Sequence, residues 1–135
     1  MIDSVLLIDD NQSTNFLHNR ILKKSGKVRS VTAVQSAREA LDFLTTTTAD
    51  GTFPQPNLIF LDINMPGMNG WEFLDAYRLL PQEQRGKIVI VMLTTSLNPD
   101  DRARANSIAE INEFSYKPLS MEVIDALVGK YFVAG

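Results

Sequence analysis

The stretch LIFLDINMPGMNG, residues 58–70, is a short apolar run that ends on a carboxylate and continues into turn-forming residues. Its long aliphatic side chains and its shortness predict a β-strand at residues 58–62 rather than a helix. Polar and apolar residues do not alternate along the run, which is typical of a strand covered on both faces in a parallel sheet. The Pro and Gly residues after Asp62 predict a tight turn into a following helix.

Four other runs predict strands. Residues 4–9 and 88–93 are as apolar as the first run, whereas residues 28–34 and 112–116 are more polar. Apolar strands belong in the centre of a parallel sheet, and the polar ones suit its edges. Numbered along the chain, the strands therefore predict the order 2-1-3-4-5 of a doubly wound sheet, in which ligands bind where the order reverses, between the first and third strands.

Helical patterns separate the strands. In the first, Leu17, Ile21 and Leu22 share one stripe, with Ser13 as a plausible N-cap and Gly26 as a plausible stop. Four further apolar stripes or helix-start signals fall at residues 37–44, 73–77, 99–107 and 124–131. The alternation of strands and helices predicts an α/β fold with five helices flanking a five-stranded parallel sheet.

Length and composition restrict the possible functions. The chain has 135 residues, of which 44% are hydrophobic, so we expect one domain over residues 1–135 with no output domain. The net charge of -3 gives no reason to expect nucleic-acid binding. There is no cysteine, and the N-terminal apolar run is far too short to cross a membrane. We therefore expect a cytoplasmic protein that binds neither nucleic acid nor membrane.

Chemically distinctive residues stand at the carboxyl ends of the predicted strands. Asp9 and Asp10 end the first, Asp62 the third, Thr94 the fourth and Lys117 the fifth. In the predicted topology these side chains converge on one edge of the sheet. Two carboxylates about 4 Å apart repel by about 4 kcal/mol at an effective dielectric constant of about 20. Lys117 can offset part of that charge, and a hard divalent cation, Mg²⁺ first and Mn²⁺ next, can offset the rest.

Such a set of groups is suited to phosphoryl transfer, which depends on cations and donors placed around the phosphate oxygens. Asp62 is the best candidate nucleophile, because carboxylates form aspartyl-phosphate intermediates. Asp9 and Asp10 are then the metal-holding residues. The metal ion would contact one phosphate oxygen, Lys117 a second and Thr94 a third.

Four motifs occur in order, each at a predicted strand end: the acidic pair Asp9 and Asp10, LDINMPGMNG around Asp62, VMLTTS around Thr94, and YKPL around Lys117. Together they resemble the response-regulator receiver domain of two-component signalling, and the chain is similar to single-domain, chemotaxis-type regulators. The resemblance covers essentially the whole chain and implies a flavodoxin-like fold.

The resemblance implies that Asp62 accepts a phosphoryl group from a phosphohistidine on a partner histidine kinase or phosphotransfer protein. Asp10, Asp62 and the backbone carbonyl of Asn64 would ligate Mg²⁺, with Asp9 assisting. Lys117 would contact Asp62 or its phosphate, and its bond to the following proline is cis in the family. The protein would be a regulator that catalyses only its own phosphorylation and slow dephosphorylation, rather than an enzyme.

The family also implies how the signal leaves the site. Thr94 would move toward the phosphate and Phe114 would turn inward, which reshapes the face of the fourth predicted helix, the fifth strand and the last helix for a downstream protein. The protein would be a monomer or a phosphorylation-linked dimer. Three features depart from the family: Thr95 is larger than the usual small residue, Phe114 lacks the common tyrosine hydroxyl, and SIAEINE replaces the usual Gly-Ala turn before the fifth strand.

Two other functions compete with this interpretation. A Mg²⁺-dependent phosphatase of the haloacid-dehalogenase kind also uses an aspartyl nucleophile, but Asn64 stands where such enzymes place a general acid. A receiver-like scaffold that never accepts phosphate would not need the intact set of acids and lysine. Among the remaining residues, we expect His18 to be a surface or packed histidine rather than a ligand, and Trp71 to be half-buried on the third helix.

Overall fold

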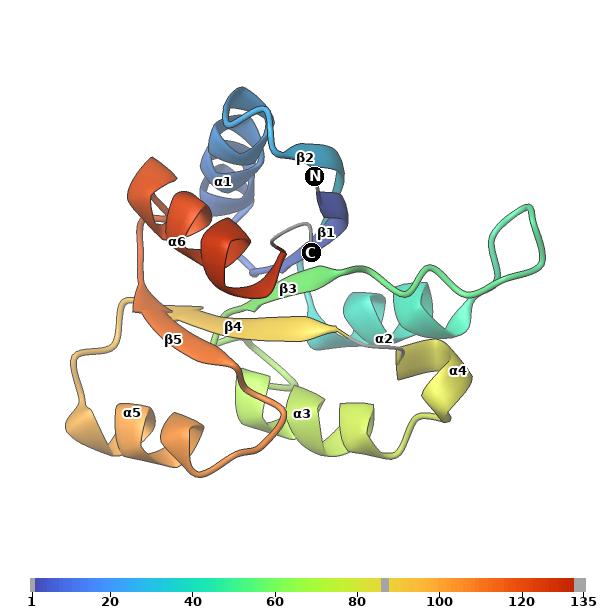
Figure 1. The fold of residues 1–135 in the computed structure, drawn as a ribbon. Helices are drawn as coiled ribbons and strands as arrows, with labels where there is room; N and C mark the ends of the chain where they lie inside the picture. The colour runs from blue at the N-terminus through green and yellow to red at the C-terminus, as the bar shows by residue number, and fades with distance from the viewer. Residues whose placement is uncertain (1, 86–87, 133–135) are drawn as a thin grey trace.

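A five-stranded parallel sheet forms the centre of the molecule (Figure 1). The computed structural model describes residues 2–85 and 88–132. The strands are β1 Ile2–Ile8, β2 Val28–Val34, β3 Leu58–Leu61, β4 Val89–Thr94 and β5 Glu113–Tyr116. Their order is β2-β1-β3-β4-β5 with every pair parallel, which confirms the predicted flavodoxin-like sheet and its polar edge strands.

Six helices surround the sheet in the described part of the chain, so the predicted number of five was wrong. They are α1 Gln12–Lys24, α2 Ala37–Thr45, α3 Gly70–Arg78, α4 Gln82–Arg85, α5 Pro99–Asn106 and α6 Met121–Tyr131. The unpredicted helix, α4, is a single turn that begins directly after Pro81 and buries none of its residues. A turn this short and polar leaves no apolar stripe, and for that reason the sequence pattern missed it.

The helices cover the sheet in two layers (Figure 1): α1 and α6 lie on one face, and α2, α3 and α5 lie on the other. Successive residues of the central strands face these layers in turn. In β1, Leu6 packs in the same buried cluster as Phe73 of α3, whereas Leu7 packs with Leu22 of α1. Covering on both faces explains why these strands are apolar throughout. None of the described helices is long and apolar enough to cross a membrane.

The ends of α1 correct one prediction and confirm another. The Asn11 side chain, not that of Ser13, caps the helix, because its Oδ1 accepts a hydrogen bond from the Thr14 N–H at 3.0 Å. Ser13 is exposed inside the first turn. Gly26 follows the helix with φ +71°, a left-handed conformation that glycine adopts without strain and that commonly ends helices.

The buried face of α1 also differs from the predicted stripe. Leu22 is fully buried as expected, but Leu17 is 59% exposed. The side chains that face the sheet with Leu22 are polar, Asn15 and His18. The Asn15 amide nitrogen and His18 Nε2 both have backbone hydrogen-bond partners outside the helix, whereas the Asn15 side-chain oxygen is buried without one.

The turn after β3 is shaped by a close backbone approach. A Cβ on Gly70 would collide with the carbonyl oxygen of Asp62, so only glycine fits there. The Gly70 N–H donates to the Ile63 carbonyl at 2.8 Å, and Asn69 and Glu72 form a capping box that begins α3. Trp71 is 7% exposed, buried rather than half-buried as predicted. This local structure fixes the main chain that follows Asp62.

Candidate functional site

The carboxyl ends of the central strands meet at one edge of the sheet. The Asp62 N–H donates to the Ile8 carbonyl at 3.0 Å, and the Lys117 N–H donates to the Thr94 carbonyl at 2.8 Å. These bonds join the ends of β1 and β3 and the ends of β4 and β5. In the order β2-β1-β3-β4-β5 the direction of winding reverses between β1 and β3. The carboxyl ends of these two strands are the usual ligand-binding position of such sheets.

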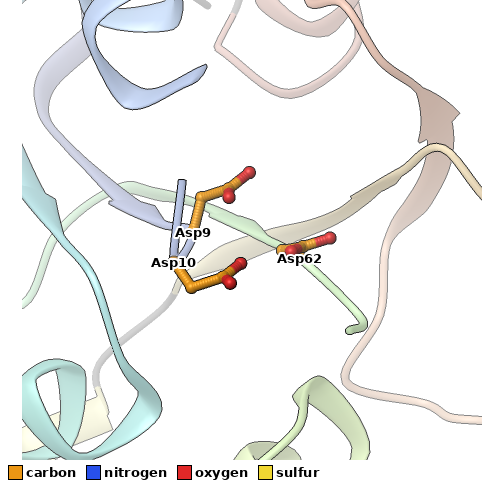
Figure 2. A group of neighbouring side chains, drawn as sticks. All are labelled: Asp9, Asp10 and Asp62. Carbon is orange, nitrogen blue, oxygen red and sulfur yellow. The ribbon is translucent and has the colours of Figure 1, made fainter. Parts of the chain in front are cut away.

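Three carboxylates gather at this edge (Figure 2). Asp9 and Asp10 follow β1 and Asp62 follows β3, and their side chains point to the same side in Figure 2. One oxygen from each lies within 4.8 Å of those from the other two. Asp9 and Asp62 are buried, with 4% and 7% of their surface exposed, whereas Asp10 is exposed. Oxygen ligands with this spacing could hold a hard cation.

Lys117 supplies a positive charge to the same cluster. Its Nζ lies 2.5 Å from Asp9 Oδ2 and 3.2 Å from Asp62 Oδ1. The second oxygen of Asp9, Oδ1, accepts the Asn11 N–H at 2.9 Å, so both Asp9 oxygens have partners. The peptide bond from Lys117 to Pro118 is cis, as the resemblance implies.

The electrostatic environment raises the pKa of the Asp62 carboxyl above its ordinary value of 3.8. Burial is the largest cause, because it removes the charged form from water. The Lys117 charge acts in the opposite direction, and the nearby Asp9 carboxylate raises the pKa again. Ionised Asp62 is thus held at a cost in free energy that a cation at the site would offset.

Thr94 is completely buried at the end of β4. Its Oγ1 accepts the Ser96 N–H at 3.0 Å, and the Ser96 hydroxyl donates to Asp101 Oδ2 at 2.5 Å. The hydroxyl therefore belongs to a hydrogen-bonded chain that runs into the first turn of α5. Thr95 is exposed beside it, and Asn64 is exposed in the loop two residues after the Asp62 carboxylate.

Phe114 stands apart from the acidic cluster. It pairs with Met92 across the sheet and is half-buried. Its ring contacts Tyr116 edge to face, with ring centres 5.6 Å apart, and the Arg102 guanidinium of α5 lies 5.9 Å from its centre. The structure thus brings the three acids and Lys117 together, whereas Phe114 lies on the surface formed by α5 and β5.

Two residues near the cluster were not identified as site residues from the sequence. Asn15 donates from Nδ2 to the Asp9 carbonyl at 2.9 Å, and His18 Nε2 accepts the Leu119 N–H at 3.2 Å. With Asp9 and Asp62, they line a small cavity of about 10 Å³. The only sequence signal was the occurrence of two polar residues three positions apart in a helix, which periodicity alone assigns to a solvated face.

Comparisons with known proteins agree with this geometry. The family model "Response regulator receiver domain" matches residues 5–129. The probable methanogenesis regulatory protein FilR2 of Methanothrix harundinacea is 31% identical over 118 residues, which cover 87% of this chain and 74% of that protein. The response regulator Rcp1 of Synechocystis is 34% identical over 97 residues, which cover 72% of this chain and 65%, less than two thirds, of Rcp1.

Solved structures give the same result. The crystal structure of a two-component response regulator from Cytophaga hutchinsonii superposes with a TM-score of 0.85 and 36% sequence identity, and the match covers 96% of each chain. The fold, the strand-end acids and the family match over nearly the whole length lead to one conclusion. The chain belongs to the response regulator receiver domain family.

Proposed function

We propose that this protein is a phosphorylation-dependent signalling switch in which Asp62 is the phosphate acceptor. The observation that carries the proposal is the position of its buried carboxylate, within 4.8 Å of two other carboxylates and 3.2 Å from Lys117 Nζ. The phosphoryl donor would be a phosphohistidine on a histidine kinase or phosphotransfer protein. The match to hybrid signal transduction histidine kinase C of Dictyostelium discoideum, 26% identical over 132 residues, supports this class of partner.

The donor set fits a divalent cation. Carboxylate oxygens are the ligands that Mg²⁺ and Mn²⁺ prefer, and the cluster carries more negative charge than Lys117 can offset. Asp10, Asp62 and the carbonyl of Asn64 would bind the ion directly. Asp9 would assist without binding it directly, because both of its carboxylate oxygens already have partners. A solved structure of Rcp1 is a Mn²⁺-bound form, which supports the same ion class here. When bound, the cation supplies charge stabilisation to the phosphate oxygens.

In the proposed transfer, an Asp62 carboxylate oxygen attacks the phosphorus atom. The bond between phosphorus and the donor imidazole nitrogen breaks, and the imidazole leaves with the electron pair and takes up a proton. Lys117 Nζ already lies between Asp9 and Asp62, so it can contact a phosphate oxygen after a small movement. Because the pKa of Asp62 is raised, its ionised form is disfavoured in the absence of a cation. A neighbouring cation would favour the ionised nucleophile, and it would also stabilise the charge of the transition state.

The output would begin at Thr94. If its hydroxyl turns to a phosphate oxygen, the bond from the Ser96 N–H is lost, and the loop that leads into α5 is released from its present position. Phe114 and Arg102 would repack in response, because they connect β5 to α5. A downstream protein would recognise the changed surface of α5, β5 and α6. The protein would therefore act as a regulator rather than as an enzyme that turns over a substrate.

Intact-mass measurement tests the proposal. We expect one phosphate adduct when the protein is incubated with acetyl phosphate and Mg²⁺, and none when EDTA is present. The variant Asp62→Asn should give no adduct, whereas Asp50→Asn, which changes an exposed carboxylate on a distant loop, should react normally. No adduct on the unmodified chain, or an adduct that survives in Asp62→Asn, would contradict the proposal. Rapid hydrolysis of the donor without an adduct would favour a phosphatase.

A further inference from the structure

One helix holds the main chain on both sides of the candidate site. Asn15 and His18 lie one turn apart on the buried face of α1 and are 5% and 4% exposed. The Asn15 amide donates to the carbonyls of Asp9 and Val34, at 2.9 and 3.2 Å. His18 Nε2 accepts the N–H of Leu119, a residue 101 positions away. The two side chains therefore connect the Asp9 backbone and the segment that follows Lys117 to the same rigid element.

The backbone donors of this segment show why the His18 contact matters. The Lys117 N–H donates to the Thr94 carbonyl at 2.8 Å, Pro118 has no N–H, and the Leu119 N–H donates to His18. Residues 117–119 are thus held by β4 at one end and by His18 at the other. The Lys117 side chain extends from between these two attachments to Asp9 and Asp62.

His18 can accept this bond because its imidazole is neutral. Burial lowers its pKa below the ordinary value of 6.5, and the positive charge of Lys117 lowers it further. With Nε2 as the acceptor, the ring proton is on Nδ1. An apolar residue at this position would leave the buried Leu119 N–H without a partner, which favours movement of the segment.

We propose that His18 is a positioning residue for phosphoryl transfer: by accepting the Leu119 N–H, it anchors residues 117–119 to α1 and so fixes Lys117 Nζ beside the Asp62 carboxylate. Asn15 fixes Asp9 from the same helix, so α1 sets the spacing between the lysine and the acids. The inference rests on the proposed function, because it concerns the reaction at Asp62.

Three variants of His18 separate this role from simple packing. His18→Leu removes the acceptor, His18→Gln places an amide oxygen close to the position of Nε2, and His18→Asn places one nearer to that of Nδ1. We expect His18→Leu and His18→Asn to accept phosphate from acetyl phosphate about tenfold more slowly. This is the low end of the loss seen when a residue that orients a metal-binding side chain is removed. His18→Gln should restore most of the rate. The affinity for Mg²⁺, measured by calorimetry, should stay unchanged in all three.

A second measurement does not depend on activity. The Leu119 amide should exchange with solvent faster in His18→Leu and His18→Asn than in His18→Gln or the unmodified protein, as followed by NMR. If folded His18→Leu accepts phosphate at the normal rate, or if Gln and Asn slow the reaction equally, the proposal is wrong. Parallel loss of Mg²⁺ affinity would also overturn it. If the unmodified protein forms no phosphate adduct, the proposed function is wrong. If the unmodified protein and His18→Leu are phosphorylated equally fast, only the role of His18 is wrong.

Discussion

The replacement Asp62→Asn should make the metal-free protein more stable. Repulsion between carboxylates up to 4.8 Å apart is about 3.5 kcal/mol at an effective dielectric constant of about 20, and Asp62 faces two of them. Its attraction to Lys117 at 3.2 Å is about 5 kcal/mol on the same scale. Solvent screens the repulsion from exposed Asp10, so the two repulsions nearly cancel the attraction, and the burial of the charged carboxylate leaves a net cost of about 1–2 kcal/mol. We expect the free energy of unfolding to rise by that amount.

Urea unfolding near neutral pH in EDTA measures this difference. Asp62→Asn should unfold at a higher urea concentration with an unchanged slope, and Asp50→Asn should match the unmodified protein. Adding Mg²⁺ should narrow the gap, because a ligand that binds only the folded state stabilises the unmodified protein selectively.

The pH dependence provides a further check. The folded-state pKa of Asp62 is raised, so the folded protein retains the proton over a range in which the unfolded chain has lost it. The stabilisation that comes from this raised pKa is fully present below about pH 3.8, the ordinary pKa of the carboxyl. It is lost as the pH rises through the folded-state pKa of Asp62. The advantage of Asp62→Asn should therefore grow with rising pH and then level off. No gain at neutral pH, or a gain that grows toward acid, would refute the reasoning.

Three further variants test other parts of the account. Lys117→Met leaves two buried carboxylates without their cation, and we expect a loss of about 3 kcal/mol in metal-free urea unfolding, partly recovered by Mg²⁺. Gly70→Ala places a Cβ against the Asp62 carbonyl, and thermal unfolding should show a loss of about 1–3 kcal/mol together with a slower phosphorylation rate. Asn11→Ala should cost about 1 kcal/mol because it removes the helix cap, whereas Ser13→Ala should be almost neutral in the same urea assay.

Each of these expectations has a clear contrary result. Undiminished stability of Lys117→Met in EDTA would mean that the lysine does not compensate the acids. A normal phosphorylation rate in Gly70→Ala would show that the turn tolerates the added methyl group without moving Asp62. Equal losses for Asn11→Ala and Ser13→Ala would contradict the observed cap.

The sheet was predictable because burial on both faces leaves a direct trace in the sequence. Residues 58–61 and 88–93 are apolar throughout, and the structure places β3 at Leu58–Leu61 and β4 at Val89–Thr94, one residue later than predicted. The convergence of Asp9, Asp62 and Lys117 followed from the same pattern, since parallel strands bring their carboxyl ends to one edge.

The features that the sequence did not reveal depend on contacts between distant residues. His18 is buried because its imidazole meets a backbone N–H 101 residues away, and no local pattern encodes that partner. Asn11 and Ser13 are both acceptable caps by residue type, and only the backbone path of the loop after Asp9 selects Asn11. The single turn α4 has no buried side chain and so leaves no periodic signal.

Chemical trapping of the phosphorylated residue tests the central claim most directly. Borohydride reduces an acyl phosphate to an alcohol, so treatment after incubation with acetyl phosphate and Mg²⁺ marks the phosphorylated carboxylate permanently. Peptide mapping should then find one reduced side chain, at Asp62, and none when EDTA is present. Reduction at Asp9 or Asp10 instead, or no reduced residue at all, would contradict the assignment of Asp62 as the phosphate acceptor.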